Sequence, residues 1–111
     1  WLKLMPTSLN DQFVALSQQL NQLISLLEEA DDRFWIAYIK RGLKQVDENK
    51  LAGATFILGC YGGEDTFSDV VIAKHWQEEN PLKFQNANAR LGQLRNDIFT
   101  TASSIASRRH W

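Results

Sequence analysis

The sequence predicts an all-α fold, a single-domain bundle of about four main helices with one irregular Gly-Gly loop and a short extended segment before the last helix. Apolar residues recur at steps of three and four over most of the chain, which is the period of an amphipathic helix. The length of 111 residues suits one domain, and a hydrophobic content of 44% is sufficient for one core. We expect residues 1–6 to be a disordered or non-native N-terminus and residues 7–111 to form the helical domain.

The first half of the chain predicts two amphipathic helices joined by an acidic turn. The first runs from residue 9 to residue 29, and its apolar stripe consists of Phe13, Leu16, Leu20, Leu23, Ile24 and Leu27. The second is capped by Asp31 and Asp32, and Gly42 in its middle would allow another helix to approach closely. Its expected buried side consists of Phe34, Trp35, Tyr38, Ile39, Leu43 and Val46.

The middle of the chain predicts a short third helix, which begins near residues 47–49 and is apolar on nearly all sides. Such a helix belongs in the centre of a bundle, although residues 54–60 also fit a buried β-strand. Gly62 and Gly63 then end the helix, because glycine adopts the left-handed conformation that closes one. Residues 70–72 are β-branched and favour an extended or short helical segment.

The last helix begins at Asn80 and Pro81, where asparagine acts as the cap and proline occupies the first helical position. It continues to about Ser107, and Arg108 and Arg109 follow where positive charge is favourable. Its apolar stripe consists of Leu82, Phe84, Ala87, Leu91, Leu94, Ile98, Ala102 and Ile105.

Composition limits the classes of function. The chain has 12 Lys and Arg against 13 Asp and Glu, and this net charge of −1 lacks the basic excess of nucleic-acid-binding proteins. No apolar run reaches the length of a membrane span, and no signal peptide is recognisable. Cys60 is the only cysteine, so an intramolecular disulfide cannot form. We therefore expect a cytoplasmic protein that binds neither nucleic acid nor membrane.

No set of residues has the spacing of a catalytic or cofactor site, so we expect no enzymatic activity and no cofactor. The glycine pair 62–63 precedes Glu64 and Asp65, whose charge would repel phosphate. His75 lacks metal-ligand spacing, and a metal site would require it to converge with Asp65 and Asp69. If these three residues did converge, the chain would be a small metal-dependent helical enzyme, which is the second alternative function.

The segment after the glycine pair is the candidate interaction site. Glu64, Asp65 and Asp69 surround Phe67, and an aromatic residue among acids on a loop is typical of a hot spot for a basic partner. Trp76, in the connection to the last helix, would belong to such an interface if it is exposed. The alternative is structural: Phe67 folds back onto the core and Asp69 caps the next turn.

The same region resembles a bacterial family of small helical proteins. The resemblance consists of Tyr61-Gly62-Gly63, Thr66-Phe67, Asp69 and Val70-Val71-Ile72, an aromatic-rich helix at 34–36 and an Arg-Leu-Gly-Gln-Leu-Arg helix at 90–95. Proteins of this sort look like the immunity partners of secreted interbacterial toxins.

The resemblance implies a non-enzymatic immunity protein, an antitoxin that binds a cognate toxin stoichiometrically and covers or distorts its active site. It implies no catalytic residues. The acidic loop would complement a basic surface on the toxin. A self-assembling helical adaptor, driven by the leucine-rich first helix, is the first alternative, and the sequence leaves both monomer and dimer open.

Overall fold

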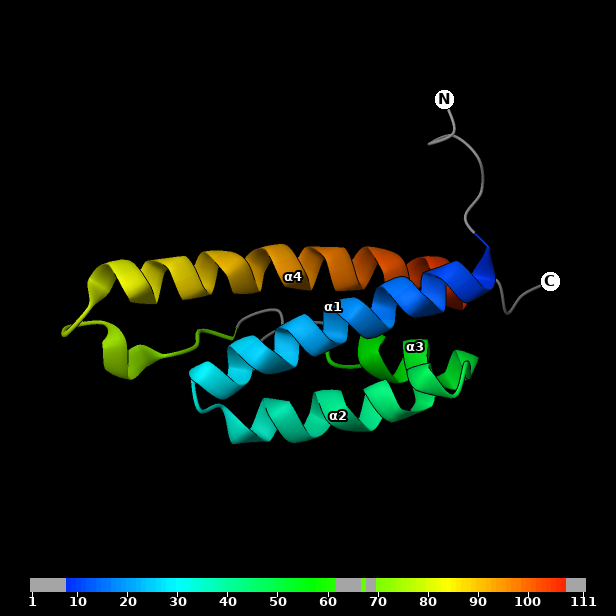
Figure 1. Cartoon of the computed structure of the whole chain (residues 1–111), viewed down its shortest axis with the longest axis horizontal. Coiled ribbons are helices and arrows are strands. Elements are labelled where there is room, and N and C mark those ends of the chain that lie inside the picture. The colour runs from blue at the N-terminus through cyan, green and yellow to red at the C-terminus, as the bar shows by residue number, and fades with distance from the viewer. Residues whose placement is uncertain (1–7, 62–66, 68–69, 108–111) are drawn as a thin grey trace, which may run out of the picture.

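The computed structural model describes residues 8–61, 67 and 70–107, and within them the chain forms four α-helices and no strand (Figure 1). The elements are α1 (Leu9–Glu29), α2 (Arg33–Asp47), α3 (Leu51–Leu58), the short 3-10 helix η3 (Lys74–Trp76) and α4 (Pro81–Ser107). The all-α prediction and the bounds of the first and last helices are confirmed. The strand alternative for residues 54–60 is wrong, because α3 is helical to Leu58. The expectation for residues 1–6 lies outside the described residues.

The helices form a bundle in which α1 lies between α2 and α4 and runs antiparallel to both (Figure 1). α3 packs against α2 and α4 at the end of the bundle where α2 finishes. At the opposite end of the bundle, η3 and the first turns of α4 extend past the ends of α1 and α2. No described helix combines the length and the apolar character that a membrane crossing requires.

The core consists mainly of the predicted stripes of α1 and α4. All six stripe residues of α1 are buried, and the stripe of α4 is buried from Ala87 to Ile105. Leu82 belongs to the predicted stripe but is 66% exposed, because the first turn of α4 projects beyond the helices that cover the rest of its apolar face.

The expected buried side of α2 is only partly correct. Ile39 and Val46 are buried, whereas Phe34 is 70% exposed. The other predicted members are partly buried against the core: Trp35, Tyr38 and Leu43. Phe34 lies in the first turn of α2, where its ring meets the edge of Trp35 at a centroid distance of 5.0 Å. A helix stripe predicts which residues share a face, but the length of the neighbouring elements decides how much of that face is covered.

α3 does not lie in the centre of the bundle, although its uniformly apolar sequence predicts that position. Its buried residues are Gly53, Ala54 and Ile57, while Ala52 and Thr55 are exposed. A helix of 8 residues at one end of the bundle is covered by α2 and α4 and faces solvent on its remaining side.

The acidic turn between α1 and α2 divides its two aspartates between two helices. Asp32 caps α2 as predicted, because its side chain accepts a hydrogen bond from the Trp35 N–H (3.3 Å). Asp31 instead ends α1, with a positive φ of 57° in the left-handed region. Asn49 has the same φ after α2, so it closes the second helix and does not begin the third.

Candidate interaction surface

Two of the five predicted interaction residues lie within the described residues. These are Phe67 and Trp76, whereas Glu64, Asp65 and Asp69 lie outside them. In the sequence, the nearest described residues before and after this acidic segment are Tyr61 and Val70. The candidate surface is therefore built from these flanking residues and from the part of α4 that they contact.

Phe67 is fully buried, with 0% of its surface exposed. Its ring packs against Trp35 of α2 at a centroid distance of 5.0 Å and against Tyr61 at 5.7 Å. Its N–H donates a hydrogen bond to the carbonyl of Cys60 (2.8 Å), which turns the chain back onto the end of α3. The expectation that Phe67 enters a pocket on a partner is corrected: apolar burial and ring contacts hold it in the core.

The segment that carries Phe67 is attached to α4 by a pair of side chains. The Tyr61 hydroxyl donates to the backbone carbonyl of Arg95 (2.8 Å). In return, Nη1 of Arg95 donates to the carbonyl oxygens of Phe67 (3.1 Å) and Val70 (3.0 Å). Hydrogen bonds from a charged donor are worth more than neutral ones, so Arg95 is a strong anchor for both carbonyls.

A second anchor follows at Ile72. The side-chain amide of Asn88 accepts from the Ile72 N–H (2.9 Å) and donates to the Ile72 carbonyl (3.0 Å). This satisfies both backbone groups of a residue that is 1% exposed and belongs to no helix. Tyr61, Phe67, Val70 and Ile72 are thus each hydrogen-bonded to a residue of α4.

Five aromatic rings form a continuous row from α2 to α4. Trp35, Phe67 and Tyr61 lie in its middle, and Phe34 and Phe99 are its exposed ends. Phe99 is 47% exposed, and its ring lies 5.2 Å from that of Tyr61. The row places the aromatic side chain of Phe99 at the surface beside Tyr61, which precedes the acidic segment in the sequence.

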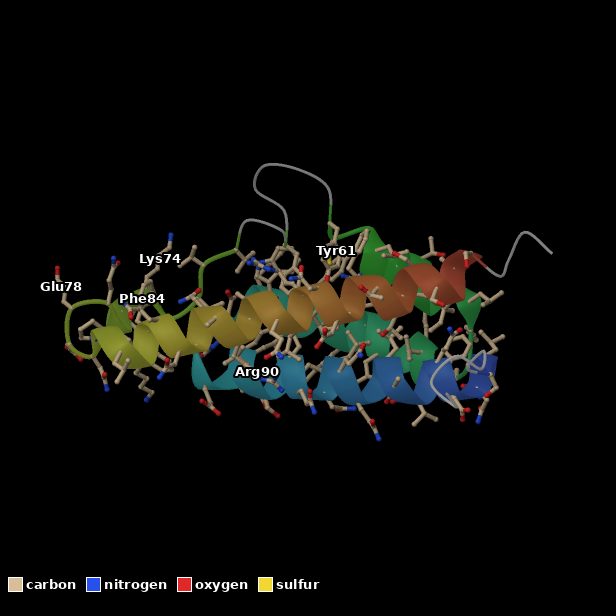
Figure 2. All side chains as sticks on the ribbon, turned by 90° about the horizontal axis from the view of Figure 1, so that it is seen from above. Tyr61, Lys74, Glu78, Phe84 and Arg90 are labelled. Carbon is tan, nitrogen blue, oxygen red and sulfur yellow. The ribbon has the colours of Figure 1, made fainter. Side chains whose placement is uncertain are left out.

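Trp76 lies away from this surface. It ends η3, which projects from the bundle beside the first turns of α4, where Figure 2 places Lys74, Glu78 and Phe84. Its ring is partly buried and lies under the Lys83 ammonium, with Nζ 4.1 Å from the ring centroid. Of the described predicted residues, one is therefore in the core and the other is at the end of the molecule.

Burial sets the protonation of two groups at the base of the segment. Desolvation raises the pKa of the Cys60 thiol from its ordinary 9.0 to about 12. The pKa of the Tyr61 hydroxyl is also raised, mainly by burial and further by Cys60, while Arg95 opposes the shift. Both groups are neutral at physiological pH, and the Cys60 thiol is buried, as its apolar surroundings predict.

Among the described residues, no three His, Cys, Asp or Glu side chains gather as they would around a metal ion. His75, the described member of the alternative metal site, contacts the edge of Trp76 at a centroid distance of 5.4 Å. Its proposed companions Asp65 and Asp69 lie outside the described residues.

Comparison of the chain with protein-family models, with curated proteins and with solved structures found no match.

The contacts that organise the surface do not follow from the sequence pattern. Asn88 and Arg95 bond with residues 16 and 25 positions away in the chain, and no local pattern marks such contacts. Phe99 lies outside the apolar stripe of α4, which indicates only the buried side of the helix.

Proposed function

We propose that this chain is a non-enzymatic binding protein, an immunity protein that neutralises a cognate bacterial toxin by tight stoichiometric binding. The bound protein would occlude the toxin's active site or distort it. Glu64, Asp65 and Asp69 provide the charge for a basic toxin surface. Phe99, whose ring contacts that of Tyr61, takes the role of the surface aromatic that the sequence had suggested for Phe67.

The observation that carries the proposal is that the described residues on either side of the acidic segment, Tyr61 and Val70, are hydrogen-bonded to α4. Tyr61 precedes Glu64 and Asp65, Val70 follows Asp69, and both Tyr61 and Val70 are hydrogen-bonded to Arg95. Anchoring a binding segment at its ends reduces the conformational entropy that association must overcome. The exposed ring of Phe99, which contacts the ring of Tyr61, supplies the kind of residue that dominates binding energy.

The test uses the toxin domain encoded by the neighbouring reading frame. We expect the purified full chain to bind this domain with one-to-one stoichiometry in calorimetry and to abolish its toxicity in cells that co-express both. Reversing two charges in Asp65→Lys/Asp69→Lys should weaken binding on the order of 100-fold, because like charges would then face each other.

The matched control is Glu28→Lys/Glu29→Lys, which changes the net charge equally at exposed positions at the end of α1. Its affinity should stay near that of the wild type. Equal weakening by both double variants would show a dependence on net charge alone and remove the acidic segment from the interface. Failure of the wild-type chain to bind the toxin domain would reject the proposed function.

A further inference from the structure

The outer side of α2 is cationic between residues 33 and 44. Every exposed position in this stretch is either basic or apolar: Arg33, Phe34, Ala37, Lys40, Arg41 and Lys44. A helix repeats every 3.6 residues, so these positions lie within about 120° of arc on one side of α2. The neighbouring helix α1 contains no Lys or Arg. We call the four cations Arg33, Lys40, Arg41 and Lys44 the basic face.

The fold makes little use of the charge on the basic face. Within the described part of the chain, Lys40 and Lys44 form no ion pair. Cζ of Arg41 lies 5.7 Å from the centroid of the Phe56 ring, and Arg33 pairs with Asp31 at 3.3 Å. The Arg33–Asp31 pair is highly exposed and contributes little to stability. Like charges four residues apart disfavour a helix, so internal stability does not explain Lys40 and Lys44.

An open hollow of about 510 Å³ adjoins the basic face, between α1 and α2. Lys40 and Lys44 line it, together with Ile24 of α1 and Leu43 of α2, and its exposed lining is mainly apolar. Apolar surface beside unpaired cations favours a ligand that carries both an apolar group and negative charge.

Two carboxylates line the same hollow at the end where α2 finishes, and both have partners. Asp47 accepts a hydrogen bond from the Ser17 hydroxyl (2.7 Å), and Glu48 pairs with Lys50 (2.9 Å). Lys50 is the main cause of the lowered pKa of Glu48, and Lys44 contributes least. An anionic ligand would therefore lie along residues 33–44, away from these carboxylates.

We propose that the basic face and the hollow bind an acidic segment of a protein partner. Its carboxylates would contact Lys40, Arg41 and Lys44, and one of its apolar side chains would enter the hollow beside Ile24 and Leu43. A polypeptide places carboxylates and apolar side chains next to each other, whereas a nucleic acid presents its phosphates and a bilayer keeps its apolar chains beneath the headgroups. This surface lies on α1 and α2 and the candidate interaction surface on α4, so the inference goes beyond the proposed function and does not depend on it.

The test measures binding of a synthetic peptide to the purified full chain by fluorescence anisotropy. The probe is a fluorescein-labelled peptide of the repeated sequence Glu-Glu-Leu, which should bind saturably at low salt and more weakly at high salt. Lys40→Glu/Lys44→Glu should weaken this binding on the order of 10-fold, because two attractive charges become repulsive. The matched control is Lys74→Glu/Lys83→Glu, which changes the net charge equally at exposed positions beyond the end of α2. This control should bind like the wild type.

A second comparison tests the hollow. A polyglutamate peptide of equal length should bind about tenfold more weakly than the Glu-Glu-Leu peptide, because it offers no apolar side chain. Asn21 also lines the hollow, and Asn21→Trp should remove the difference between the two peptides by filling the space. Asn10→Trp, an exposed position about three turns away on α1, should preserve the difference.

The outcomes are distinct. Weakening by Lys40→Glu/Lys44→Glu with an unaffected control supports the basic face as the site. Wild-type affinity in that variant, equal weakening in both double variants, equal binding of the two peptides, or no saturable binding of the Glu-Glu-Leu peptide overturns the inference. Tighter binding of a thymidine oligonucleotide, or of phosphatidylcholine–phosphatidylserine vesicles, also overturns it, because the face would then serve another class of partner.

The salt dependence and the peptide comparison use the wild-type chain alone, so they decide the question if a variant does not fold. None of these measurements involves the toxin domain. Their failure therefore leaves the proposed function standing.

Discussion

The side-chain amide of Asn88 forms two hydrogen bonds with the backbone of Ile72, in the way that a neighbouring backbone amide would in a regular element. The amide accepts at 2.9 Å and donates at 3.0 Å, and its nitrogen also donates to the Phe84 carbonyl. Asn88→Ala leaves both polar groups of the buried Ile72 without these partners, which should lower the free energy of unfolding by about 1–3 kcal/mol. Urea denaturation measures the loss. The same substitution at Asn86, an exposed position of the same helix, should change stability by less than about 0.5 kcal/mol.

The burial of Phe67 makes it a determinant of stability. Phe67→Ala should lower the free energy of unfolding by about 3–5 kcal/mol, since a fully buried aromatic ring is lost from between Trp35 and Tyr61. Phe34→Ala is the control, because its ring is 70% exposed and the loss of apolar burial is small. Chemical denaturation of both variants compares the two costs. A neutral Phe67→Ala would contradict the inward placement of this ring.

Gly42 and Gly53 lie at the contact between α2 and α3, and a side chain at either position should lower stability. Ile57 packs onto Gly42, where an added Cβ would lie 2.8 Å from Ile57 Cγ1, and one at Gly53 would lie 2.8 Å from the Val46 nitrogen. We expect Gly42→Ala and Gly53→Ala to lower stability by about 1–3 kcal/mol despite the better helix propensity of alanine. Thermal unfolding gives the sign of each effect. A Cβ atom added at Gly92 would meet no atom within 4 Å, so Gly92→Ala is the matched control, with the opposite sign. Stabilisation by all three variants would refute the close contact.

The two helix ends with positive φ should be improved by glycine. After α1, the Asp31 N–H donates to Glu28 and the Asp32 N–H to Leu27, and Asn49 occupies the equivalent position after α2. Asp31→Gly and Asn49→Gly relieve the left-handed strain and should each raise stability by about 0.5 kcal/mol, after the added entropy of the unfolded chain is subtracted. Differential scanning calorimetry resolves such shifts. Ser25→Gly, in the exposed interior of α1, should lower stability by a similar amount.

The raised pKa of Cys60 predicts sensitivity to alkali. Because the folded-state pKa is about 12 against an ordinary 9.0, the neutral thiol stabilises the fold fully below about pH 9. This contribution is lost as the pH rises from 9.0 toward 12, and the shift of Tyr61 acts in the same direction. Urea denaturation at increasing pH should show falling stability, with a shallower slope for Cys60→Ala. Identical slopes in the two proteins would contradict the burial of the thiol.

Local pattern was sufficient for much of the fold. The stripe of α1, the asparagine–proline start of α4 and the Asp32 cap depend on neighbours within one or two turns, and each is confirmed. Periodicity also placed Ala87 to Ile105 in the core. For the candidate surface, the sequence indicated the acidic residues and the glycine pair. It left two placements of Phe67 open, one on a partner and one in the core.

What the sequence by itself determined is the helical class, the bounds of the long helices and the charge of the segment between Tyr61 and Val70. Only the tertiary structure decided that Phe67 is buried, that Phe99 is exposed and that Arg95 anchors the segment. The reason is physical: a helix or a cap depends on contacts within a few residues, whereas burial depends on which distant element covers a side chain. Hydrophobicity alone did not distinguish the buried ring of Phe67 from the exposed ring of Phe99.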